Sequence, residues 1–385
     1  PLANDSSSFD IIGLVYNGIV KYDRDLNLVG DLAQSWDISP DCRRLTFHLR
    51  HGVRWHDGHK FTSEDVVFGY KIMTDPRTPT AYASAFLEVE KISAPDPYTL
   101  HIVYKRPFAP GLESWSSLVV LPHHLLEGKD ITKSELSRHP LGTGPYRFNQ
   151  WKTGERIVLD ANPDYFEGRP YISRYILRII PDQSTMFLEL LSGGIDWTGL
   201  TPLQYQRQTS SPAFRKKFAK YRYLDFAYTY LGFNLQDPRF KDTRVRRAIS
   251  YAIDRQEIID GVLLGMGAIA TGPYKPDAWA YNPHVKRYPY DPQKALSLLA
   301  KAGWERDPDG ILRKDGKPFS FTILTNQGNE QRRKVSELIQ KRLKDIGIQV
   351  SIRVIEWTVF LRDFVDKKNF EAIVLGWTTG PEPDQ

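Results

Sequence analysis

The sequence predicts an α/β fold, because segments with the spacing of strands and of helices alternate through its last third. Apolar runs of strand length occupy residues 319–324 and 370–376. Between them, apolar residues at helical spacing predict a helix at 335–346, and strict alternation predicts a strand at 348–354. Strands and helices in this order are typical of a sheet that helices cover.

The ends of the predicted helices carry the residues that helix ends prefer. Asp291 followed by Pro292 predicts the start of one helix, and Gly303 predicts its end. Gly347 terminates the helix at 335–346 in the same way.

Residues 36–70 predict a hairpin and then a helix. Short strands at 46–49 and 53–55 are predicted to pair across a turn that contains glycine. Thr62, with Asp65 three residues later, predicts a capped start for the helix that follows.

The middle of the chain is also mixed. Alternation at 156–159 and the run at 175–180 predict strands, and apolar residues at helical spacing predict a helix at 183–191. No internal repeat is visible, and a length of 385 residues predicts two or three packed units.

The net charge of +6 does not point to nucleic acid, because Lys and Arg are spread through the chain. Their richest cluster, residues 331–344, has the pattern of the polar face of an amphipathic helix. We therefore expect no nucleic-acid partner.

Cysteine and hydropathy say little about the compartment. Cys42 is the only cysteine, which excludes an internal disulfide and a thiolate metal cluster. No apolar run approaches the ~20 residues that cross a bilayer, and residues 1–5 lack the features of a signal peptide. We expect that any export signal has been removed or was never included.

The sequence contains no recognisable catalytic, metal or cofactor motif. His48, His51, His56 and His59 lie close together, but their spacing matches no common zinc site. HExxH, paired CxxC and Walker sequences are absent, and the glycines of 261–272 lack the context of a dinucleotide fingerprint. We therefore predict no catalytic residue, no metal site, no cofactor and no enzymatic activity.

Residues 36–70 also resemble the signature of the family 5 extracellular solute-binding proteins, the oligopeptide, dipeptide and nickel receptors of ABC importers. The matching residues in this segment are Trp36, Ser39, Asp41, Phe47-His48-Leu49-Arg50, Gly52-Val53, His56-Asp57-Gly58, Phe61-Thr62 and Glu64-Asp65-Val66. Further matches follow in the family's order: Val15-Tyr16-Asn17-Gly18-Ile19-Val20, Gly142-Thr143-Gly144-Pro145-Tyr146, Asn162-Pro163-Asp164-Tyr165, Leu191-Ser192-Gly193-Gly194-Ile195-Asp196, Leu231-Gly232-Phe233-Asn234, Asp242-Thr243-Arg244-Val245-Arg246, Ala252-Ile253-Asp254-Arg255, Tyr290-Asp291-Pro292 and Gly376-Trp377. Each motif is weak by itself, and the shared order carries the resemblance.

The resemblance implies a two-lobed periplasmic-binding-protein type II fold with an extra α+β subdomain. By analogy, residues 1–30 and 142–235 form the first lobe, residues 31–141 form the subdomain inserted in it, and residues 236–385 form the second lobe. Members of the family continue well beyond the Gly-Trp motif, so we expect the second lobe to be incomplete and the chain to be truncated at its C-terminus.

The resemblance also implies where a ligand binds. The segment around Asn17 lines the cleft, and Ile19 pairs with the ligand through its backbone. The matching contacts from the other lobe are Trp377, Thr378, Thr379 and Gly380. Tyr82 and Trp357 match cleft aromatics, and the alternative for each aromatic ring, Trp377 included, is a role in packing only.

Two departures from the family's pattern concern charge. Peptide receptors of this family usually carry an Asp three residues after the motif Trp, and this chain has Gly380 there. Either Glu382 or Asp384 supplies a shifted carboxylate, or the ligand carries no ammonium at that point. The tripeptide-type receptor has an Arg where this chain has Val374.

These features together predict an extracytoplasmic receptor, periplasmic or a cell-surface lipoprotein, that captures peptides in an interlobe cleft. We expect oligopeptides rather than dipeptides, delivery to ABC permease subunits, and a monomer. The alternatives are a nickel chelate, an opine or an oligosaccharide as ligand, or a sensor module in a cytoplasmic transcriptional regulator. A hydrolase is a further rival that turnover of a peptide library would reveal.

Overall fold

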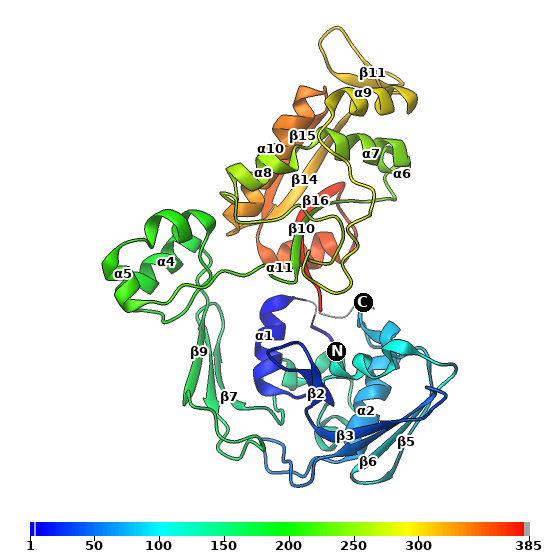
Figure 1. Cartoon of the computed structure of the whole chain (residues 1–385), viewed down its shortest axis with the longest axis vertical. Helices are drawn as coiled ribbons and strands as arrows, with labels where there is room; N and C mark the ends of the chain where they lie inside the picture. Colours follow the sequence, from blue (N-terminus) through cyan, green and yellow to red (C-terminus); the bar gives the residue numbers. More distant parts are fainter. Residues whose placement is uncertain (4, 381–385) are drawn as a thin grey trace. The chain divides into compact units, whose positions relative to one another are not determined.

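The computed structural model describes residues 1–3 and 5–380 (Figure 1). By its internal contacts the chain forms two compact units, one of residues 1–179 and one that begins at Ile180. Residues 180–235, which the resemblance assigns to the first lobe, are grouped by their contacts with the second unit. The division into two lobes and an inserted subdomain stays a prediction. None of the described helices is both long and apolar enough to span a membrane.

The first unit contains a four-stranded antiparallel sheet in the order β3-β4-β6-β5. Its core includes the fully buried Phe47, Trp55 and Trp115. In chain order the elements are α1 (Ser6–Val15), β1 (Val20–Tyr22), β2 (Leu28–Gly30), β3 (Ala33–Ile38), β4 (Arg44–Leu49), α2 (Ser63–Thr74), η1 (Ala83–Phe86), β5 (Val89–Asp96) and β6 (Thr99–Tyr104).

The hairpin predicted between residues 46–49 and 53–55 is wrong. β4 contains the predicted strand 46–49, but its two edges pair with β3 and β6. Because no edge of β4 is left, residues 53–55 form no strand beyond an isolated bridge from Arg54 to Lys60. Trp55 is instead a buried anchor whose ring N–H donates to the Asp65 carboxylate at 3.3 Å.

The predicted capped helix is confirmed as α2. The backbone N–H of Thr62 donates to the Asp65 carboxylate at 2.9 Å, as a capping box requires. Asp65 is buried, and it also accepts the backbone N–H of His123 at 3.1 Å. One side chain therefore caps α2 and joins it to the first residue of α3 (His123–Leu126).

A second, three-stranded antiparallel sheet completes the first unit, in the order β7-β8-β9. The predicted strands at 156–159 and 175–180 are confirmed as β8 and β9. Val15 at the end of α1 packs against Tyr146 and Leu159 of this sheet. The remaining elements are η2 (Ala109–Gly111), η3 (Glu113–Ser116), α3 (His123–Leu126), η4 (Ile131–Lys133), η5 (Glu135–Ser137), β7 (Tyr146–Lys152), β8 (Arg156–Ala161) and β9 (Arg174–Arg178).

The second unit contains a four-stranded mixed sheet in the order β10-β16-β14-β15. β14 is parallel to β15 and to β16, and β10 is antiparallel to β16. The strands are β10 (Ala227–Phe233), β14 (Ser320–Asn326), β15 (Gln349–Ile355) and β16 (Ala372–Thr378), and a small separate sheet holds β11 (Glu305–Arg306), β12 (Leu312–Lys314) and β13 (Lys317–Pro318).

Helices cover both faces of this sheet, which confirms the predicted α/β fold. α7, α9 and α10 bury one face in the larger core, through residues such as Ile249, Leu299 and Ile339. α11 and η7 bury part of the other face through Trp357 and Phe360. The helical elements of the unit are α4 (Gln183–Ser192), η6 (Gln204–Gln208), α5 (Pro212–Lys217), α6 (Pro238–Lys241), α7 (Thr243–Ala252), α8 (Arg255–Gly261), α9 (Pro292–Lys301), α10 (Glu330–Asp345), α11 (Trp357–Val359) and η7 (Phe360–Val365). The predicted helix at 183–191 is α4.

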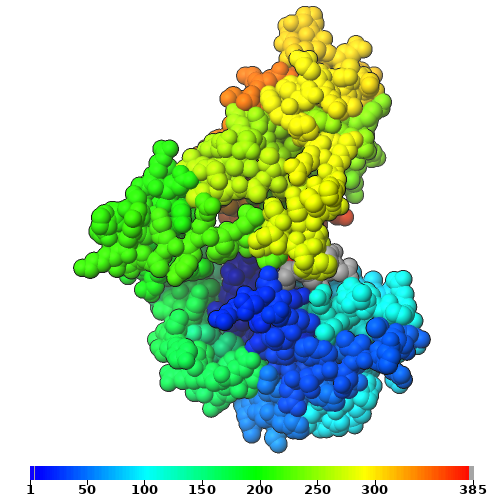
Figure 2. All heavy atoms as spheres, viewed as in Figure 1, coloured from blue at the N-terminus to red at the C-terminus, as the bar shows by residue number. Residues whose placement is uncertain are grey.

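Irregular chain also contributes to the surface of the second unit. Residues 264–290, between α8 and α9, contain no helix or strand and run over this surface (yellow in Figure 2).

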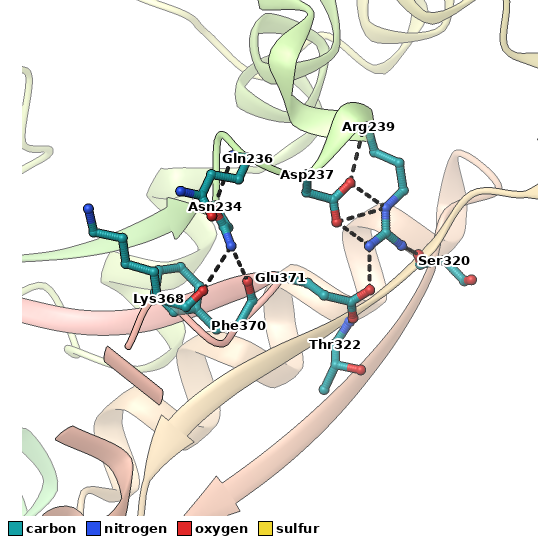
Figure 3. A network of polar contacts seen from close by, with 9 residues as sticks. All are labelled: Asn234, Gln236, Asp237, Arg239, Ser320, Thr322, Lys368, Phe370 and Glu371. Atoms are coloured by element: carbon teal, nitrogen blue, oxygen red, sulfur yellow. Dashed lines mark hydrogen bonds and ion pairs between the residues drawn. The ribbon is translucent and has the colours of Figure 1, made fainter. Parts of the chain in front are cut away.

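A polar network holds the start of β16 to its neighbours (Figure 3). The amide of Asn234, just after β10, donates to the carbonyls of Lys368 and Phe370, both at 3.0 Å. Glu371 forms an ion pair with Arg239 of α6. The Leu-Gly-Phe-Asn motif therefore has a structural role at this end of the sheet.

Candidate ligand-binding site

The 16–20 segment of the first unit follows α1, and its polar side chain is fully engaged. Asn17 is 8% exposed, and its amide donates to both oxygens of Asp31, at 3.0 and 3.1 Å. The same amide group donates to the hydroxyl of Tyr165 at 3.2 Å, while its oxygen accepts the Thr143 hydroxyl at 2.9 Å. Asn17 thus links its own segment to three other stretches of the chain.

The buried carboxylate beside Asn17 is compensated from two sides. Burial raises the pKa of Asp31, and the ammonium of Lys21, 3.4 Å away, opposes that shift. The backbone N–H of Gly18 also donates to Asp31 at 3.0 Å. Asp31 therefore fixes the backbone of the 16–20 segment.

Ile19 is buried as a whole residue, backbone included. It is 0% exposed, and its carbonyl accepts the N–H groups of Asp31 and Ala33 at 3.1 and 3.0 Å. Among the described residues no acceptor takes the N–H of Ile19. The expected backbone pairing of Ile19 with a ligand stays a prediction.

The Gly142-Thr143-Gly144 turn positions the same segment from behind. A Cβ on Gly142 would lie 1.9 Å from the Val15 carbonyl oxygen, so only glycine fits there. His56 closes the turn: its Nδ1 accepts the Gly142 N–H at 3.3 Å and its Nε2 donates to the Gly144 carbonyl at 3.0 Å. Burial lowers the pKa of His56 to about 4, which keeps the ring neutral. Sequence reasoning gave this motif no role, although its two glycines are the signal of a close backbone approach.

Tyr82 lies against the helix that leads to the 16–20 segment. Its ring is partly buried and contacts Phe9 of α1 edge to face, with ring centroids 5.9 Å apart. It also packs against the core of the first unit. The structure thus supports the packing role for Tyr82, and a ligand contact stays a prediction.

In the second unit, the predicted contacts lie at and just after the carboxyl end of β16. Trp377 is 49% exposed and pairs with Tyr228 of β10. Thr379 is buried, and its N–H donates to the Phe226 carbonyl at 2.7 Å. Thr378 is exposed and Gly380 partly exposed, whereas Glu382 and Asp384 lie outside the described residues.

One side of this strand end is open. β14 pairs with β16 only at Ala372 and Ile373, and the Thr325 hydroxyl donates to the Val374 carbonyl at 3.1 Å. Beyond that point, residues 376–378 have a strand partner only in β10 among the described residues. An unpaired strand edge can accept an extended chain by backbone hydrogen bonding.

Trp357 lies at the same end of the sheet. It follows the carboxyl end of β15, which is parallel to β14, as is β16. The carboxyl ends of parallel strands are where α/β sheets commonly bind ligands. Its ring packs against Phe360, with 6.2 Å between the ring centroids. Because the ring is only partly buried in this cluster, part of the indole stays exposed at this end of the sheet.

Sequence reasoning missed Arg332 in the first turn of α10. Its Nη1 donates to the side-chain oxygen of Asn326, the last residue of β14, at 2.8 Å. A Cβ placed on Gly376 would lie 2.7 Å from its Nη2, so the guanidinium lies directly on β16. Burial lowers the pKa of Arg332. The available signal was a cation in the first helical turn after a parallel strand.

The opposite end of the same sheet holds an open hollow of about 340 Å³. It is lined by Asn234, Arg353, Phe364 and Glu371 among others, next to the network of Figure 3. None of the predicted site residues lines it.

The chain is similar to known solute-binding proteins in sequence and in fold. The family model described as "Bacterial extracellular solute-binding proteins, family 5 Middle" matches residues 27–385. The oligopeptide-binding protein AppA of Bacillus subtilis is 33% identical over 100% of this chain and 72% of its own length.

Solved structures give the same picture. AppA of Bacillus subtilis, in complex with a nonapeptide, superimposes with a TM-score of 0.91 at 32% identity, covering 100% of this chain and 77% of that one. NikZ of Campylobacter jejuni with Ni(L-His) gives 0.89 at 30% identity, with coverages of 97% and 74%. DppA of Helicobacter pylori with the peptide STSA gives 0.84 at 31%, with coverages of 98% and 75%. The periplasmic-binding-protein fold is therefore confirmed.

Proposed function

The chain belongs to family 5 of the bacterial extracellular solute-binding proteins, and on that premise we propose that it captures peptides and delivers them to an ABC permease. The observation that carries the peptide assignment is the open edge of β16 at residues 376–378, beside the half-exposed Trp377. A peptide backbone can extend a sheet there whatever its side chains are. The similarity to AppA, whose structure holds a nonapeptide, supports the same ligand class.

Oligopeptides fit this edge better than dipeptides. Gly380 offers no carboxylate at the point where a free α-amino group would otherwise be fixed. Without a fixed ammonium, affinity has to come from backbone pairing and aromatic contact, and both increase with the number of residues bound.

We place the second half of the site on the 16–20 segment, through the N–H of Ile19. In this proposal the segment and residues 376–380 are both contacts of the bound ligand. Tyr82, Trp357, Thr378 and Glu382 are further proposed contacts.

The rest of the assignment follows from the family. Its members are extracellular binding proteins, so we propose that this receptor works outside the cytoplasm, in the periplasm or as a surface lipoprotein. We also propose that it acts as a monomer without catalysing a reaction.

A metal–amino-acid chelate is the second candidate ligand. NikZ, solved with Ni(L-His), is 30% identical and has a TM-score of 0.89. Within the described residues no cluster of three or more His, Cys, Asp or Glu side chains could hold a metal ion, so the ligand would have to bring its own donors.

Native mass spectrometry with a mixed-length peptide library tests the proposal. We expect peptides longer than dipeptides to be retained without cleavage, and a nickel–histidine mixture to be outcompeted. Retention of the nickel chelate with no bound peptide would replace the first candidate by the second. Cleaved peptides would contradict the receptor assignment.

A further inference from the structure

Five polar side chains of the first unit form a closed circuit at the 16–20 segment. The amide of Asn17 donates to Asp31 and to the Tyr165 hydroxyl. That hydroxyl donates to a carboxylate oxygen of Glu167 at 3.2 Å, and the same oxygen accepts the Lys21 ammonium at 2.6 Å. Lys21 Nζ lies 3.4 Å from Asp31 Oδ1, so each of the five side chains contacts two others.

The circuit joins three stretches of the chain. Asn17 and Lys21 come from the segment and from β1, and Asp31 follows β2, which pairs with β1. Tyr165 and Glu167 lie between β8 and β9. The Asn-Pro-Asp-Tyr motif, to which sequence reasoning gave no role, thus ends in a residue that contacts the segment.

Lys21 is the cation that faces the buried carboxylate of this circuit. The side chain of Asp31 is 4% exposed, whereas those of Lys21 and Glu167 are each 36% exposed. Burial raises the pKa of Asp31, the ammonium of Lys21 lowers it, and the charge of Glu167 adds a smaller rise. Because an opposite charge favours the ionised form, Lys21 keeps Asp31 ionised at a lower pH than burial alone would allow.

The other charged and titratable groups around Asp31 act differently from Lys21. Arg50 donates from Nε to the main-chain carbonyl of Asp31 at 2.6 Å, rather than to its carboxylate. Burial raises the pKa of Tyr165, so its hydroxyl carries no charge at neutral pH. Glu167 has the same sign of charge as Asp31, and its contact with the ammonium holds Lys21 in place.

The charge of Asp31 decides how firmly the backbone of the segment is held. The ionised carboxylate accepts the Asn17 amide at both oxygens and the backbone N–H of Gly18 at 3.0 Å. A protonated carboxyl has an O–H donor in place of part of this acceptor capacity, so these contacts weaken. Gly18 lies between Asn17 and Ile19, so the weakening falls on the part of the segment that is expected to meet the ligand.

We propose that Lys21 is a positioning residue for peptide binding: it acts through Asp31 and holds the 16–20 segment in the conformation that the ligand meets. The inference rests on the proposed function and adds to it a dependence of binding on the charge of a buried carboxylate.

The test is a pH profile of peptide affinity. Isothermal titration of the whole chain with a pentapeptide of Ala and Phe would be run at pH 6.5 and pH 5, between which both peptide termini keep their charge. We expect the affinity of Lys21→Met to fall about tenfold from pH 6.5 to pH 5 and that of the wild type to fall about twofold. The reason is that loss of the ammonium raises the pKa of Asp31 further.

Matched variants separate positioning from other effects. Lys21→Arg keeps the cation and should restore the wild-type profile. Lys152→Met makes the same substitution in another lysine–glutamate ion pair of the first unit and should follow the wild type. Lys21→Gln repeats the test if Lys21→Met does not fold, and thermal unfolding at both pH values checks each variant.

Equal pH profiles for Lys21→Met and the wild type would overturn the inference, as would a loss of affinity that is the same at both pH values. In either case the wild type still binds the peptide, so the proposed function stands. A wild type that binds no peptide at pH 6.5 would overturn the proposed function, and this inference with it.

Discussion

The 16–20 segment of the first unit and residues 376–380 of the second are both predicted to bind ligand, but their polar groups are in opposite states. The amide of Asn17 is used completely within the protein. At the end of β16, residues 376–378 have a strand partner on one side only, and the guanidinium of Arg332 has one hydrogen bond, to Asn326, among the described residues. The first segment is therefore built for position and the second for contact.

The largest effect is expected from Gly142→Ala. The new methyl group would lie 1.9 Å from the Val15 carbonyl oxygen, so the turn and the segment behind it would have to separate. We expect a loss of about 3 kcal/mol or more in the free energy of unfolding, measured by urea denaturation.

Gly13→Ala is the matched control, because nothing lies within 4 Å of its added Cβ and it occupies a helix. This variant should be neutral or more stable by up to about 1 kcal/mol. A Gly142→Ala protein as stable as the wild type would show that the segment is not held from behind.

The second effect is a pH dependence of stability centred on His56. Its pKa is about 4 in the folded protein against 6.5 in the unfolded chain, so the unfolded state binds more protons between these values. Stability should therefore fall as the pH decreases from 6.5 to 4 and lose up to about 3 kcal/mol from this group.

The His56 contribution is isolated by comparing unfolding free energies of the wild type and His56→Gln from pH 8 to pH 4. The difference between the two should shrink as the pH falls. His101→Gln, at an exposed position, is the control for replacing a histidine elsewhere in the first unit. A constant difference between wild type and His56→Gln would contradict the neutral, buried ring.

Asn17→Ala separates position from contact. Removing the amide leaves the buried Asp31 without two hydrogen bonds, at a cost of about 2 kcal/mol in stability. Asn27→Ala, on an exposed turn, is the control and should cost far less. A variant that is fully stable but fails to bind peptide would make Asn17 a direct ligand contact and reverse the comparison.

The smallest effect is expected from Trp377→Ala. The side chain is 49% exposed, so stability should change by less than about 1 kcal/mol, while peptide affinity falls about tenfold through lost aromatic contact. Trp279→Ala, with a side chain 76% exposed, serves as the control and should leave binding unchanged. Unchanged affinity in Trp377→Ala would remove this ring from the site.

Local patterns predicted most of the secondary structure, and the order of the motifs indicated the family. The predicted hairpin was wrong. Thr62 and Asp65 form the expected cap, and the helix before Gly347 and the strand after it appear as α10 and β15. Residues 53–55 have the composition of a strand, yet β4 already has a partner on each edge. The competition for an edge depends on strands far away in the chain, which no local pattern contains.

The order of strands and helices, the helix caps and the positions of the glycines could be read from local sequence, because they depend on neighbours a few residues away. The fold is what brings Asp31, Thr143 and Tyr165 to the amide of Asn17 and lays Arg332 against Gly376. The physical reason is that the cost of a buried polar group depends on which distant partners the fold brings to it.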